Sequence, residues 1–323
     1  MKKIDISKFQ SLIGLIVFSV IVAFINSRFM TTSNILNILR QTSINAVIAT
    51  GMTFVILTGG IDLSVGSILG FSGAVAAMML ASGVDSIIAI PVALIVGLVV
   101  GALNGVLISK GKLQPFIVTL ATMTMLRGAT LVFTDGKPIG TGFEANSKLF
   151  AWFGNGYVLG IPVPIIVIIV TFLVALFVLT QTKIGRYVYA LGGNEEATKL
   201  SGISTDKVKI FVYAISGMMA ALAGIIITSR LSSAQPTAGS GYELDAIAAV
   251  VLGGTSLAGG TGTIVGTMIG ALIIGVLNNA LNLMDVSSYF QMLAKVSLQQ
   301  QRNQLQKKQQ EQQKLVWEYL LLT

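Results

Sequence analysis

The sequence predicts an all-α polytopic membrane protein, a helix bundle with two glycine-broken segments and a short helix on the cytoplasmic side. Of the 323 residues, 54% are hydrophobic and only 11% are charged, whereas a soluble domain carries about 25% charged residues. The mean hydropathy is +0.83. Long uncharged stretches recur along the chain, and about 20 apolar residues in a helix cross a bilayer. These observations exclude an ordinary soluble domain.

Nine stretches are long and apolar enough to be candidate transmembrane helices. In chain order they cover residues 11–27, 42–58, 64–82, 86–109, 115–134, 162–181, 210–230, 244–258 and 262–284. Glycines at spacing four occur in 97–105 and 262–270. Small residues at this spacing let helix backbones approach closely, so a compact bundle is expected.

The basic residues indicate the orientation. With the N-terminus in the cytoplasm, alternation places Lys110, Lys112 and the five basic residues of 183–209 on the cytoplasmic side. Five other basic residues, including Arg28 and Arg40, fall outside. Basic loops favour the cytoplasmic side, so the bias supports this orientation without being absolute.

Residue types that are missing narrow the chemistry. The chain contains no histidine and no cysteine, which excludes disulfides, a thiol nucleophile, an imidazole base and the usual ligands of zinc or haem. The sequence therefore predicts no metal site and no cofactor bound by this chain. The net charge of +8 comes mainly from loops and the C-terminal tail, so we expect contact with the lipid bilayer and no nucleic-acid partner.

Two candidate spans are broken by glycine and resemble each other. Residues 59–64 (GGIDLS) align with 253–258 (GGTSLA), and the following glycines also align after a two-residue gap. In transporters, interrupted hydrophobic segments at corresponding positions of two halves indicate the substrate pathway. The alternative is a pair of ordinary tight connections. On this ground we assign to the pathway Gly59, Gly60, Asp62, Ser64, Gly253 and Gly254.

Polar residues inside the spans need an explanation. Asp62 lies between apolar runs, so it either shapes the substrate path or caps the helix that begins near Leu63, and the two roles are compatible. Asn278 and Asn282 share a helix face and suit an uncharged hydroxylated substrate, so we add both to the pathway. Asparagine in membrane helices more often links helices. Arg127 lies about 10 Å from the outer end of its span and is expected to extend outward.

The loop 183–209 predicts a short ordered helix. The turn, the N-cap and the acidic first turn are supplied in order by Gly192, Gly193, Asn194, Glu195 and Glu196. Gly202 is expected to end this helix after two turns. A stiff element between two spans can transmit force from a partner, and the alternative is a solvated connection.

Four stretches, 61–67, 189–203, 230–239 and 241–255, are characteristic of one family. In them, and more broadly from residue 30 to 291, the chain resembles the ribose-type permease subunits of bacterial ABC importers. The resemblance implies a multi-pass homodimer in the bacterial inner (plasma) membrane. It also implies two partners, a periplasmic sugar-binding protein that delivers ribose or a related monosaccharide, and a cytoplasmic ABC ATPase.

By the same likeness, 192–203 is the cytoplasmic coupling helix, and the residues assigned to ATPase coupling are Gly192, Gly193, Asn194, Glu195, Ala197 and Gly202. The glycine-broken segments would flank the translocation path, and the loops 135–161 and 231–243 would meet the binding protein. The chain has no GxxxxGK[ST] phosphate loop. It is therefore predicted to be a transport subunit and not an enzyme, with ATP used by the partner subunit.

The resemblance stops near the C-terminus. Permeases of this kind finish with a further apolar span, whereas here nine glutamines fall between residues 299 and 313. Such a segment cannot cross a bilayer, and a shift of reading frame near codon 296 would produce it. We therefore divide the chain into a transmembrane permease domain, 1–296, and a glutamine-rich polar tail, 297–323, outside the bundle.

Two other functional classes compete. A secondary, ion-coupled sugar transporter would need a buried carboxylate and a full set of discontinuous helices, for which Asp62 alone is a thin basis. Transport in vesicles that lack any ATPase would favour it. An intramembrane serine hydrolase would lack the usual histidine base, and no serine and lysine occur together at membrane depth.

Overall fold

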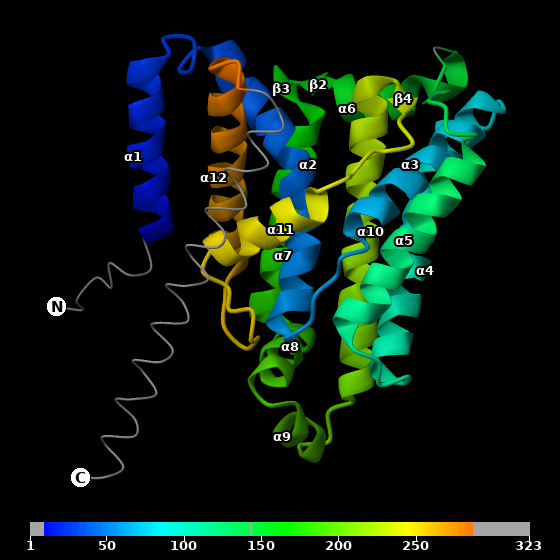
Figure 1. The fold of residues 1–323 in the computed structure, drawn as a ribbon, viewed down its shortest axis with the longest axis vertical. Helices are drawn as coiled ribbons and strands as arrows, with labels where there is room; N and C mark the ends of the chain where they lie inside the picture. Colours follow the sequence, from blue (N-terminus) through cyan, green and yellow to red (C-terminus); the bar gives the residue numbers. More distant parts are fainter. Residues whose placement is uncertain (1–9, 143, 287–323) are drawn as a thin grey trace.

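The computed structural model describes residues 10–142 and 144–286 (Figure 1). These residues form helices and four two-residue strands, which confirms the predicted fold class. The helices are α1 (Gln10–Ile25), α2 (Thr32–Leu57), α3 (Val65–Ala81), α4 (Ser86–Ser109), α5 (Pro115–Phe133), the 3-10 helix η2 (Ala145–Ser147), α6 (Lys148–Asn155), α7 (Val163–Gln181), α8 (Lys183–Gly193), α9 (Glu195–Leu200), α10 (Thr205–Leu231), α11 (Tyr242–Leu252) and α12 (Ile264–Leu283).

The long helices run roughly side by side between two ends of the molecule. One end carries α8 and α9, at the bottom of Figure 1, and we call it the α9 end. The other end carries α6 and the strands, and we call it the strand end. Five described helices, α4, α5, α7, α10 and α12, are long and apolar enough to cross a membrane. These five match predicted spans closely, because continuous apolar runs leave little choice of structure.

Two helices are shorter than a span and begin inside the bundle. Residues 58–64 are not helical and rise from the end of α2 to the middle of the molecule, where α3 starts (Figure 1). Residues 235–241 come down from the strand end to α11 in the same way. The prediction of a transmembrane helix over 244–258 is therefore wrong. The helix there has 11 residues, about 16 Å of rise, because Gly253 and Gly254 follow it directly.

Small residues hold the central helices close together. A Cβ atom added to Gly97 or Gly101 of α4 would lie 2.4 Å and 2.1 Å from backbone oxygens of Gly217 and Tyr213 on α10. Gly270 of α12 approaches α11 in the same way, with its added Cβ 1.9 Å from the oxygen of Ala249. The predicted close packing of the glycine stripes is confirmed for these helices.

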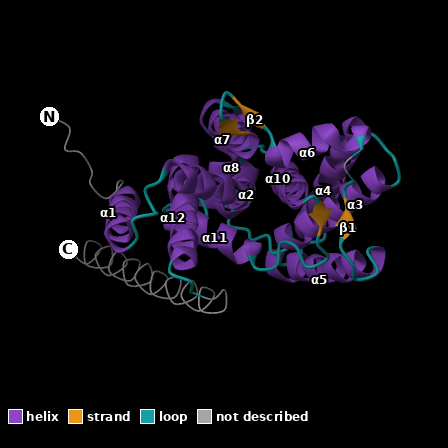
Figure 2. Cartoon of the chain, turned by 90° about the horizontal axis from the view of Figure 1, so that it is seen from above, coloured by secondary structure: helices purple, strands orange, loops and turns teal. Residues whose placement is uncertain are grey.

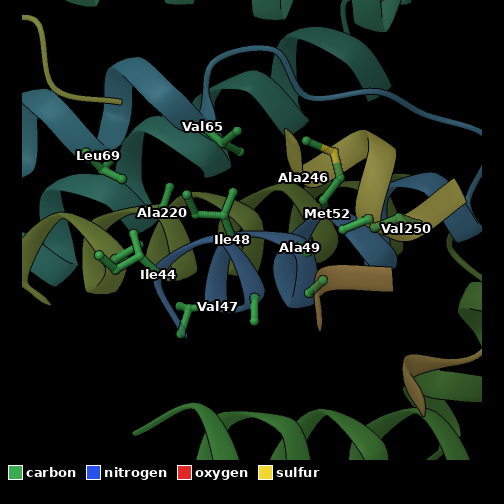
Figure 3. Packing of buried hydrophobic residues seen from close by; sticks show 14 of the residues in the cluster. Ile44, Val47, Ile48, Ala49, Met52, Val65, Leu69, Ala220, Ala246 and Val250 are labelled. Carbon is green, nitrogen blue, oxygen red and sulfur yellow. The ribbon is translucent and has the colours of Figure 1, made fainter. Parts of the chain in front are cut away.

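The core lies where α2 meets α3, α10 and α11. Its buried side chains include Ile48 and Met52 of α2, Val65 of α3 and Val250 of α11 (Figure 3). Because α2 is surrounded in this way, 16 of its 26 residues are buried. The core therefore joins the two shorter helices, α3 and α11, to the same central helix.

The strand end is held by short sheets and by α6. Strand β1 (Ile139–Gly140) pairs antiparallel with β4 (Ser233–Ala234), and β2 (Tyr157–Val158) pairs with β3 (Ile161–Pro162). Ser229 of α10 accepts the Gly154 N–H at 2.8 Å and fixes α6 against the bundle. The loops 135–161 and 231–243 thus contact each other, although their sequences did not predict a sheet.

Candidate functional site

The two glycine-broken segments meet at the α9 end. The Gly260 N–H donates to the Leu57 oxygen at 2.9 Å, and a Cβ atom added to Gly259 would lie 2.7 Å from the Gly59 nitrogen. Gly59 and Gly259 have φ values of +76° and +86°, which favour glycine. We call the residues 57–60, 192 and 259–262 the glycine junction.

The last residues of α8 complete the glycine junction. A Cβ atom added to Gly192 would lie 1.8 Å from the Leu57 oxygen and 2.5 Å from the Gly260 nitrogen. The Tyr189 hydroxyl donates to the Gly262 oxygen at 2.9 Å. Burial raises the pKa of the Tyr189 phenol, so the hydroxyl keeps its proton at neutral pH. The junction therefore links α8 directly to both broken segments.

Gly253 and Gly254 lie away from the glycine junction, at the end of α11. Gly253 packs on α12, where its added Cβ would lie 2.3 Å from the Gly266 carbonyl. Gly254 has a φ of +91° and open space at its Cβ position. The structure thus gives the second glycine pair a role in the turn and in packing, while Gly259 and Gly260 make the contact with the first broken segment.

Asp62 lies at the centre of a buried polar network. One carboxylate oxygen accepts the Ser64 N–H at 3.0 Å and the Ser64 hydroxyl at 2.6 Å, and the other accepts the Ser216 hydroxyl of α10 at 2.8 Å. Asn104 of α4 donates to the Ser64 hydroxyl at 3.0 Å and accepts the Thr122 hydroxyl of α5 at 2.6 Å. The polar network of these five residues connects the start of α3 to three helices.

These contacts bear on the two roles considered for Asp62. Its side chain is fully buried, so in this conformation it does not face an open cavity. It accepts the N–H of Ser64, the residue just before α3, instead of an N–H within the first helical turn. Asp62 and Ser64 thus fix the shape of the broken segment, and buried carboxylates are tolerated when satisfied in this way.

The two asparagines assigned to the pathway, Asn278 and Asn282, lie on α12, away from the polar network. Asn279 exchanges two hydrogen bonds with Asn34 of α2, at 3.0 Å and 2.9 Å, and this is the helix-linking role that asparagine often has. Its neighbour Asn278 has a buried side-chain oxygen without a hydrogen-bond partner among the described residues. Asn282 lies one turn further along α12, near the strand end. The structure does not bring Asn278 and Asn282 to Asp62 or to the glycine junction.

The predicted coupling helix is present but shorter than 192–203. Helix α9 has six residues, and the Asn194 side chain caps it by accepting the Ala197 N–H at 2.9 Å. Gly202, with a φ of +79°, lies in the turn after it. Gly192 and Gly193 do not form the expected turn, because they are the last residues of α8. Ala197 is exposed on α9.

An ion pair links helix α9 to the bundle, and a cavity opens next to it. Lys209 of α10 lies 2.6 Å from the Glu195 carboxylate. A cavity of about 500 Å³ opens beside this pair and reaches the first broken segment. Its polar lining includes Thr58, Lys112, Glu195, Lys199, Asp206 and Lys209. Leu200 is 89% exposed at the end of α9.

Comparisons with known proteins identify the family of the chain. Residues 34–298 match the model of the branched-chain amino acid transport system permease component family. The chain belongs to this permease family. The ribose import permease protein of Haemophilus influenzae is 63% identical over 286 residues, which cover 88% of each chain. The ribose import permeases of Escherichia coli and Bacillus subtilis are 58% and 57% identical, and both matches cover 88–89% of each chain. No solved structure matches the chain significantly.

Sequence reasoning missed two features of this permease. Arg127 does not extend to the membrane surface as expected, because its Nη1 donates to the Ala238 oxygen at 2.6 Å inside the fold. Tyr213 of α10 donates to the Ile61 oxygen at 3.1 Å and so holds the first broken segment. Tyr189 makes a similar contact with the second broken segment and lies in a stretch characteristic of the family. No sequence pattern marks Tyr213 as a residue that contacts the first one.

Proposed function

We propose that the chain is the transmembrane permease subunit of an ABC importer that moves ribose, or a closely related monosaccharide, into the cytoplasm. The observation that carries this proposal is the identity of 57–63% to ribose import permeases over nearly nine tenths of the chain. All three relatives are named as import permeases, so nothing in the comparisons favours an ion-coupled carrier.

In this proposal the chain works as a homodimer and binds no cofactor. A cytoplasmic ABC ATPase hydrolyses ATP and contacts α9, and a periplasmic sugar-binding protein docks on the strand end. The N-terminus and the α9 end face the cytoplasm of a bacterium with the permease in its inner (plasma) membrane. The glycine junction supports this assignment, because movement of α8 and α9 would reach both broken segments directly.

The experiment that tests the proposal is reconstitution in liposomes. The chain is expected to co-purify from native membranes with an ABC ATPase and a sugar-binding protein. Together they should accumulate radiolabelled ribose only when ATP is supplied on the α9 side. Accumulation without the ATPase would contradict the proposal and would support the ion-coupled alternative.

Ala197→Glu should abolish ATPase binding. Ala197 is exposed on α9, and a carboxylate buried there without a partner would oppose docking. We expect ribose uptake to fall about tenfold or more while the chain still inserts in the membrane. A bulky charged residue at Gly193 should act in the same way. Ala81→Glu, at the strand end of α3, is the matched control and should leave ATPase co-purification unchanged. Normal stimulated ATP hydrolysis in Ala197→Glu would contradict the coupling role.

A second prediction concerns the tail. Helix α12 ends at the strand end, where Asn26 donates to the Leu283 oxygen at 3.1 Å, and residues 297–323 lie outside the described residues. Charges in a central membrane position cost about 2.5–3.5 kcal/mol each, so the basic, glutamine-rich tail should stay in the periplasm. A reporter fused to the C-terminus that is active only in the cytoplasm should therefore be silent. Restoring an apolar span after Lys295 should raise transport and make the reporter active.

A further inference from the structure

A cavity with two charged residues in its lining opens on an otherwise apolar face of the bundle. Helices α5 and α11 lie along the same edge of the molecule (Figure 2). Between them is a cavity of about 460 Å³, with Thr124, Arg127, Ser240 and Glu243 in its lining. Cavities of about 300–1,000 Å³ suit small ligands. We call these four residues and the space between them the α5–α11 cavity.

The surroundings make such a cavity unexpected. Met125 and Leu131 of α5 are 65% and 42% exposed, so the helix face around the cavity is apolar. Arg127 is 12 residues from the start of α5 and six from its end, which corresponds to about 18 Å and 9 Å. Charged groups at this depth are costly in lipid and mark substrate pathways or water-filled spaces. Arg127 and Glu243 therefore make the cavity suited to a polar ligand.

The two charged side chains are held near each other but do not neutralise each other in an ion pair. Among the described residues, ion pairs within 4.0 Å occur only at Lys137–Asp135 and Lys209–Glu195. Arg127 and Glu243 both line the cavity, but their charged atoms lie more than 4.0 Å apart. The hydrogen bond to the Ala238 oxygen uses one of the five N–H donors of Arg127. The other donors of Arg127 make no hydrogen bond within the part of the chain that the structure describes.

Glu243 is incompletely satisfied as well. Its Oε1 accepts the Gly241 N–H at 3.2 Å, whereas its Oε2 has no hydrogen-bond partner among the described residues. This oxygen lies against the start of α3, where a Cβ atom at Gly66 would be 2.4 Å away. A buried acceptor without a donor costs free energy. A ligand hydroxyl that met the carboxylate, after rotation of its terminal torsion, would remove that cost.

We propose that Arg127 and Glu243 bind hydroxyl groups of the sugar in transit, with Thr124 and Ser240 as further hydrogen-bonding groups. One cation, one carboxylate and two hydroxyls give a site without net charge that both donates and accepts, which fits a neutral polyhydroxylated ligand and disfavours a sugar phosphate. The inference rests on the proposed function, because it concerns the sugar that this permease carries.

The test uses the reconstituted importer with ribose as the probe and measures ribose accumulated per ATP hydrolysed. Glu243→Gln keeps an acceptor for the Gly241 N–H but removes the charge, and Arg127→Lys keeps the charge but removes the planar donor set. We expect either variant to lower ribose per ATP about fivefold or more, with ATP hydrolysis stimulated by the binding protein within about twofold of the unaltered protein.

Asp85→Asn is the matched control, because Asp85 also accepts one backbone N–H at a helix start, from Ile87 at 2.8 Å, but lies outside the cavity. It should change neither quantity. If Glu243→Gln and Arg127→Lys lowered uptake and stimulated ATP hydrolysis in equal proportion, or left ribose per ATP unchanged, the residues would be structural and the inference would be wrong. If the unaltered importer moved no ribose at all, the proposed function itself would fail.

Discussion

Gly192→Ala should reduce ribose uptake about tenfold or more and lower the free energy of unfolding by about 1–3 kcal/mol. The added methyl group would overlap the Leu57 oxygen, 1.8 Å away, and the Gly260 nitrogen. Both neighbours are backbone atoms, which cannot move aside as a flexible side chain can. Relief of the overlap requires α8 to shift away from the glycine junction. Uptake and thermal unfolding of the purified chain measure the two effects.

Gly193→Ala is the matched control for this prediction. Gly193 is the next residue of α8, and no heavy atom lies within 4 Å of its added Cβ. Alanine there should leave the free energy of unfolding and the uptake within about twofold of the unaltered protein. If the two substitutions had equal effects, the loss would come from the altered end of α8 in general and not from the contact with Leu57 and Gly260.

Asp62→Ala should also cause a large loss, because it leaves three donors of the polar network unpaired. These are the N–H and the hydroxyl of Ser64 and the hydroxyl of Ser216. Each buried group left without a partner costs about 1–3 kcal/mol. We expect the free energy of unfolding to fall by about 3 kcal/mol or more and uptake to be severely impaired.

Asp62→Asn separates the geometric role of Asp62 from its charge. The amide oxygen can still accept from Ser64, and the amide nitrogen can donate to the Ser216 hydroxyl after that hydroxyl reverses. Much of the uptake should therefore remain in the Asn variant. Equal and severe loss in both variants would show that the charge itself is needed, and normal uptake in both would remove Asp62 from the pathway. Thermal unfolding should rank Ala well below Asn.

The sequence predicted the long spans well because an apolar run of about 20 residues has few stable alternatives in a bilayer. It failed at 244–258, where the candidate span was extended past Gly253 and Gly254 although the glycine break was recognised in the sequence. Helix α8 was also not predicted, because Gly192 and Gly193 were expected to form a turn and are instead the last two residues of this amphipathic helix. The predicted residue Asn194 was correctly recognised as a cap, since capping depends on a few neighbouring residues only.

The site was harder to predict than the spans because its contacts join distant parts of the chain. The repeat assigned both broken segments to the substrate pathway but did not predict that they touch. In the structure Gly259 and Gly260 contact Gly59 and Leu57. Asn278 was assigned to the pathway because it shares a helix face with Asn282, but its neighbour Asn279 makes the hydrogen bonds with Asn34 of α2. Arg127 could not be placed from its own helix, since its partner Ala238 lies 111 residues further along the chain.

The pairing of β1 with β4 couples the movements of two loops at the strand end. Strand β1 follows α5, and β4 precedes α11, so two residue pairs fasten together the elements that carry Arg127 and Glu243. Because the two strands are paired, a displacement of the loop that carries β1 or of the loop that carries β4 would move both walls of the α5–α11 cavity together. Each hydrogen bond contributes only about 0.5–1.5 kcal/mol net, so separating these two short strands costs little free energy. Loss of these two residue pairs would let the walls of the α5–α11 cavity move independently of each other.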